Sequence, residues 1–82
     1  MTGLTRLEIL RRARGWTQTD VSRMIGVSGG LISHIERRAR SSYPKLRRAL
    51  SELYGVPEET LFEPETGMAA WVDPELLRRL AG

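Results

Sequence analysis

The polar side chains that could bind a ligand or do catalysis gather in one stretch, "SGGLISHIERRAR", residues 28–40. It holds the only histidine of the chain, His34, with two serine hydroxyls and three arginines. The chain has no cysteine and no second histidine to complete a metal site. No carboxylate or hydroxyl stands at a spacing that would pair it with His34 for acid–base or nucleophilic chemistry. We therefore expect no metal, no cofactor and no enzymatic activity, and interpret the stretch as a binding surface.

The charge of the chain is divided between its two parts. Residues 1–50 hold eleven basic residues and three acidic ones, a net charge of +8, whereas residues 51–82 hold two basic and seven acidic residues, a net charge of −5. So basic a segment favours a polyanionic partner, of which nucleic acid is the most common. A solvated basic surface with no partner is the alternative that charge alone leaves open.

The stretch must be positioned by helices, because apolar residues recur every three or four positions over residues 4–62. We expect an all-α fold of five helices, near residues 4–14, 18–25, 28–37, 44–54 and 58–62. Expected end signals are Gly15, Gly26 and Gly55 after helices, and Thr17, Ser28 and Pro44 at helix starts. In the second helix, Asp20 stands three positions after Thr17 and predicts a capping box. Val21, Met24 and Ile25 are expected to form the inner face of this helix.

Residues 63–82 are expected to form a linker, "EPETGMA", followed by a short helix that Asp73 and Pro74 begin. This divides the chain into a domain over 1–62 and a tail over 63–82. The tail carries an unusual amount of apolar surface. Its candidate interface residues are Trp71, Leu76, Leu77 and Leu80. Three interpretations are open: the tail packs on the helices, forms a dimer interface, or docks another protein.

Two short helices joined by the turn Gly26-Val27-Ser28 have the arrangement of a helix-turn-helix, whose second helix enters the DNA major groove. Arg11, "RGWTQTDVSRMIGVSGGLISHIER" and "YGVPEETLF" together resemble the phage-repressor and Cro-like (XRE) family of DNA-binding proteins. The resemblance covers about residues 4–62. It implies a five-helix repressor-like domain that binds double-stranded DNA, usually as a homodimer and as a transcriptional regulator.

The resemblance also implies roles for individual residues. The positions that would face the bases are Ser28, Gly29, Gly30, Ser33 and His34. Those that would contact phosphates are Thr17, Gln18, Arg37, Arg38 and Arg40, and Gln18 would also brace the second helix of the motif. Arg11 and Glu36 would form a structural ion pair. Ser22 stands where the family usually has alanine, and its hydroxyl is expected to bond to the carbonyl of Gln18.

Gly29 and Gly30 depart from the family pattern, because long polar side chains often fill these positions. Glycine cannot read a base through a side chain, but it allows a close backbone approach and leaves the helix N-terminus bare. Either this helix approaches the DNA closely, or the glycines only loosen its first turn and base reading is weak.

The sequence therefore predicts a sequence-specific transcriptional regulator, a repressor that acts as a dimer on a near-palindromic site. The alternative is an antitoxin-type protein-interaction module, whose tail binds a partner protein and whose DNA binding regulates its own promoter. No apolar run is long enough for a membrane span and the N-terminus lacks a signal peptide, so we expect a cytoplasmic protein, associated with the nucleoid when bound to DNA.

Overall fold

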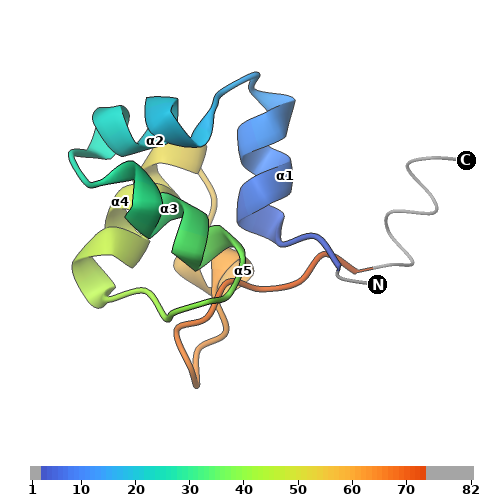
Figure 1. Cartoon of the computed structure of the whole chain (residues 1–82). Coiled ribbons are helices and arrows are strands. Elements are labelled where there is room, and N and C mark those ends of the chain that lie inside the picture. Colours follow the sequence, from blue (N-terminus) through green and yellow to red (C-terminus); the bar gives the residue numbers. More distant parts are fainter. Residues whose placement is uncertain (1–2, 74–82) are drawn as a thin grey trace, which may run out of the picture.

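A computed structural model describes residues 3–73, and five short helices account for most of them (Figure 1). The helices are α1 (Arg6–Ala13), α2 (Gln18–Ile25), α3 (Gly29–Glu36), α4 (Pro44–Tyr54) and α5 (Glu58–Leu61). Within residues 3–73 the extended backbone pairs only at two isolated bridges, and no strand forms. The all-α prediction is confirmed. No helix among these residues has the length and apolar character needed to cross a membrane.

The helix ends follow the local sequence signals closely. Gly26 and Gly55 end α2 and α4 with φ angles of 75° and 69°, a left-handed conformation that glycine adopts without a steric cost. The first helix begins later than expected. Leu4 lies outside it, because Thr5 is the cap: its hydroxyl accepts a hydrogen bond from the Glu8 amide, and α1 begins at Arg6.

One apolar core joins all five helices. Its buried members are Leu7, Val21, Ile32, Ile35, Leu46, Leu50, Tyr54, Leu61, Phe62 and Ala69. The expected inner face of α2 is only partly correct. Val21 is fully buried and Ile25 packs against the core, but Met24 is 48% exposed. The buried face of α2 is formed by Val21, Ser22 and Ile25, and Met24 lies at the edge of that face.

The segment after α5 is not a plain linker. Residues 63–67 make a tight turn, in which the amide of Gly67 donates to the carbonyl of Glu63 at 2.8 Å. The chain then returns along α5 and the start of α1, so that Ala69 is completely buried. Figure 1 shows this returning segment beside the N-terminal end of α1. Leu76, Leu77, Leu80 and the expected C-terminal helix lie outside the described residues.

Candidate nucleic-acid interface

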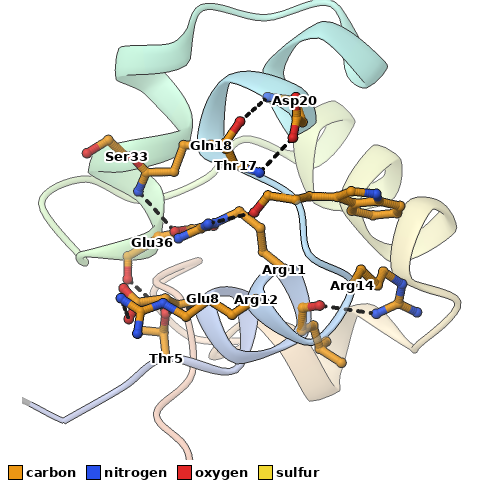
Figure 2. Close-up of polar contacts among 12 residues, drawn as sticks. Thr5, Glu8, Arg11, Arg12, Arg14, Thr17, Gln18, Asp20, Ser33 and Glu36 are labelled. Carbon is orange, nitrogen blue, oxygen red and sulfur yellow. Dashed lines mark hydrogen bonds and ion pairs between the residues drawn. The ribbon is translucent and has the colours of Figure 1, made fainter.

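The turn between α2 and α3 is fixed by caps on both sides. Thr17 and Asp20 form the expected capping box at the start of α2, with hydrogen bonds of 2.8 and 3.0 Å (Figure 2). The backbone and hydroxyl hydrogen bonds from Thr17 lower the pKa of the Asp20 carboxyl. The Ser28 hydroxyl accepts from the Leu31 amide and caps α3. These caps hold the two helices as a compact pair with only a short turn between them.

The helix α3 presents one polar face to the outside. Ile32 and Ile35 are buried, whereas Ser28, Gly30 and His34 are exposed. Gly29 and Ser33 are half-buried. The outward face therefore carries two serines, the histidine and two glycines, which are the five positions that the resemblance assigned to base contact.

The protein's own packing does not require the two glycines. Neither has a positive φ angle. A Cβ atom added to Gly29 would lie 3.8 Å from Ser22 Oγ, an ordinary contact, and one added to Gly30 would meet nothing within 4 Å. An alanine would fit at either position and would form helix more readily, by up to about 1 kcal/mol. The packing of the folded chain therefore gives no reason for glycine at either position.

Glu36, the last residue of α3, connects the first three helices (Figure 2). Its side chain is 3% exposed and accepts hydrogen bonds from Arg11 Nε at 2.8 Å and Gln18 Nε2 at 3.1 Å. Its backbone carbonyl accepts from the Thr5 hydroxyl at 2.8 Å. Arg11 donates in addition to the carbonyl of Trp16 at 2.9 Å. This network fixes the angle at which α3 leaves the body of the protein.

Electrostatics agree with this geometry. The hydrogen bond to Glu36 raises the pKa of the Arg11 guanidinium above its ordinary value, and burial opposes that rise only in part. Gln18 uses one of its two amide hydrogens for Glu36. The second hydrogen makes no hydrogen bond within residues 3–73.

The three arginines after α3 differ in their surroundings. Arg37 and Arg40 are exposed, and the Nε of Arg37 makes only a weak contact of 3.4 Å with the Ser33 carbonyl. Arg38 is partly buried. Its Nη2 lies 2.9 Å from Glu63 Oε1, and its guanidinium carbon lies 4.8 Å from the ring centre of Trp71. The structure thus directs Arg38 toward the returning C-terminal segment, whereas the resemblance directs it toward a phosphate.

Arg38 has the only positive φ angle, 61°, of any non-glycine residue among those described. Such a conformation costs roughly 1–2 kcal/mol for an L-residue with a side chain. A partly exposed ion pair contributes about 0.2–1 kcal/mol, and an exposed cation–π contact about 0.5–1 kcal/mol. The contacts with Glu63 and Trp71 are therefore of the same size as the backbone cost that they offset.

The sequence does not indicate that Lys45 lies with Tyr43 beside the turn between α2 and α3. Tyr43 and Lys45 are exposed at the start of α4, and no side chain caps the first amides of this helix. Free amides at a helix N-terminus attract anions, as lysine does. Pro44 at the first helical position was the available signal. It marked the helix start but not the side that Tyr43 and Lys45 would face.

One expected hydrogen bond has a different acceptor. The Ser22 hydroxyl donates to the carbonyl of Thr19 at 2.8 Å and not to that of Gln18. Ser22 is buried against α3 at the side of Gly29. The bond three residues back satisfies the hydroxyl within α2, so that serine fits this small space without an unpaired polar atom.

Comparison with known proteins agrees with this geometry. The family model described as a helix-turn-helix domain matches residues 5–63 of the chain, which is most of its length. The match begins at the cap of α1 and ends just after α5, so that it contains all five helices. The chain matches no curated protein and no solved structure.

Proposed function

The chain belongs to the helix-turn-helix domain family, and from that premise we propose that it is a transcriptional repressor that binds double-stranded DNA sequence-specifically as a dimer. The observation that carries the proposal is the outward face of α3, which is polar, flanked by exposed arginines and free of bulk at Gly29 and Gly30. A helix with such a face fits the major groove.

The base contacts in this proposal come from Ser28, Ser33 and His34. The backbone at Gly29 and Gly30 approaches the groove closely, because no side chain holds it away. With so few side chains that reach base edges, the shape and deformability of the DNA supply part of the specificity.

The phosphate contacts come from both sides of α3. Thr17 and Gln18 lie at the N-terminus of α2, where helix amides face outward, and Gln18 has one amide hydrogen left. Arg37 and Arg40 supply charge at the other end. The turn of residues 63–67, which carries Glu63 and Glu65, lies at the opposite end of the molecule from α2 (Figure 1). The turn is thus distant from Thr17 and Gln18 but adjoins the segment after α3, where the charge of Glu63 is paired with Arg38.

Dimerisation would place two copies of α3 about 34 Å apart, in successive turns of the major groove of a near-palindromic site. Repression would follow because a bound dimer covers promoter DNA.

A second function is favoured by Trp71, a residue of the tail segment that is 43% exposed. It is an antitoxin-type module, in which the tail also binds a partner protein. A purified chain that forms a stable dimer without a partner supports the first function, and one that stays monomeric until a partner is added supports the second.

Selection of bound duplexes from a random DNA pool tests the proposal. Enrichment of a near-palindrome, with affinity that falls steeply as salt increases, supports a dimeric sequence reader. Failure to enrich any sequence contradicts sequence-specific binding. In the Gly29→Gln, Gly30→Gln double variant the preferred sequence should change, because glutamine adds groups that contact bases. An unchanged preference would remove these two positions from the interface.

A further inference from the structure

The end of α3 is closed by a backbone motif that usually contains glycine. The amide of Ala39 donates to the carbonyl of His34 at 2.8 Å, and the amide of Arg38 donates to that of Ile35 at 3.2 Å. This pair of bonds defines a Schellman motif, whose left-handed residue is here Arg38, with a φ angle of 61°. An arginine at this position needs an explanation, because glycine would adopt the same conformation without strain.

The side chain of Arg38 supplies the explanation. It bonds to Glu63 and lies over the ring of Trp71, and both residues belong to the segment that returns after α5. Backbone hydrogen bonds fix that segment to the start of α1, from Val72 to Leu4 at 2.8 Å and from Arg6 to Ala70 at 2.9 Å. The side chain of Arg38 therefore ties the end of α3 to a part of the chain far from it in sequence, and the Ser42 amide adds a backbone bond of 2.9 Å to the Gly67 carbonyl.

We propose that Trp71 and Glu63 are positioning residues for DNA binding, which hold Arg38 in its left-handed conformation and so aim the basic segment after α3. This inference rests on the proposed function. The left-handed residue sets the direction in which the chain leaves α3, and Arg40 follows only two residues later. If the conformation relaxes, Arg40 moves away from the phosphate that it contacts. Arg38 itself acts through this turn and not through a phosphate.

The proposal predicts different behaviour for two substitutions of the same residue. Arg38→Gly removes the side chain but favours the left-handed turn, so affinity for a selected duplex should stay within about twofold of that of the original protein. Arg38→Ala removes the side chain and also disfavours the turn, so affinity should fall about three- to tenfold. Trp71→Ala should cause a similar fall, whereas Trp71→Phe, which keeps an aromatic face, should restore most of the affinity.

The decisive experiment measures affinity and its salt dependence for Trp71→Ala in two backgrounds. In the Arg38→Gly background, Trp71→Ala should cause no further loss, because the turn no longer depends on the arginine. An equal loss in both backgrounds overturns the proposal, since Trp71 would then act by another route, such as a dimer contact. Thermal unfolding of each variant identifies any that fails to fold, and Trp71→Phe then provides the comparison.

The salt dependence separates positioning from direct contact. Arg40→Ala should reduce the slope of log affinity against log salt by about 1, as the loss of one phosphate contact does. Arg38→Gly should leave the slope unchanged, and a reduction equal to that of Arg40→Ala overturns the proposal. An unsubstituted protein that binds no duplex overturns the proposed function as well. If the unsubstituted protein binds a duplex but Arg38→Gly loses that affinity, only this inference is overturned and the proposed function stands.

Discussion

Arg11 and Glu36 form an ion pair of 2.8 Å between the first helix and the end of the third, with side chains that are 11% and 3% exposed. The pair is a structural one, because neither side chain faces the outer surface of α3. Glu36 also accepts from Gln18, so a single buried carboxylate sets the positions of three helices. The orientation of the proposed DNA-reading helix depends on this contact.

Removal of one partner of this ion pair should strongly lower the stability of the protein. Glu36→Ala leaves the Arg11 guanidinium without its carboxylate, so we expect the free energy of unfolding to fall by about 3–5 kcal/mol. Arg12→Ala is the matched control, because Arg12 is 63% exposed and pairs with Glu8 on the helix surface. It should change stability by less than about 0.5 kcal/mol. Urea unfolding measures both, and equal effects would contradict a structural role for the Arg11–Glu36 pair.

Substitution of alanine for either glycine of α3 should stabilise the protein but weaken its binding to DNA. Gly29→Ala and Gly30→Ala should each raise the free energy of unfolding, by a few tenths to about 1 kcal/mol, because both positions have room for a Cβ. The same variants should bind a selected duplex more weakly, since the methyl groups would hold the backbone away from the groove. Gly55→Ala, at a φ angle of 69°, is the control that should destabilise the protein. Unchanged DNA affinity in both α3 variants would contradict the proposed close approach of the α3 backbone to the DNA groove.

The exposed side chain of His34 should contribute directly to DNA binding. His34→Ala removes a polar group from the outer face of α3, so affinity for a selected duplex should fall by about 0.5–1.5 kcal/mol, the usual contribution of one hydrogen bond. His34→Gln keeps a polar side chain and should lose less. Fluorescence anisotropy at constant ionic strength gives the comparison. An unchanged affinity in His34→Ala would remove His34 from the interface.

Tyr54 should reduce the stability of the protein at high pH. Burial, and then the negative charge of Glu36, raises the pKa of its phenol from 10.0 to about 12. Between these values the unfolded chain binds fewer protons than the folded protein, so the free energy of unfolding should fall by about 2–3 kcal/mol as the pH rises from 10 to 12. Below pH 10 this contribution is fully present.

Two variants test the assignment to Tyr54. Tyr54→Phe should lack this part of the decline, whereas Tyr43→Phe, at an exposed position, should keep it. Tyr54→Phe should also be neutral or stabilising near neutral pH, because the buried hydroxyl finds no hydrogen-bond partner in residues 3–73. An alkaline decline that is the same in Tyr54→Phe would mean that other groups cause it.

The helices and their caps could be predicted because the signals are local. Thr17 with Asp20, Ser28 and the glycines at 26 and 55 act within a few residues, and each lies where the pattern placed it. The contacts of Arg38 could not be predicted in this way. Its partners, Glu63 and Trp71, are 25 and 33 positions away, and no spacing rule connects them. The same reason explains why the sequence predicts a linker over residues 63–69, although Ala69 lies in the core.

The most direct test of the account is an NMR titration of the isotope-labelled protein with a selected duplex. The amides of Gly29 and Gly30 are suitable probes, since they lie at the start of α3 with no side chain above them. If α3 binds DNA, the largest shifts should occur at residues 17–18, 28–34 and 37–40. Shifts confined to residues 57–72, with Gly29 and Gly30 unchanged, would contradict a DNA-binding role for α3.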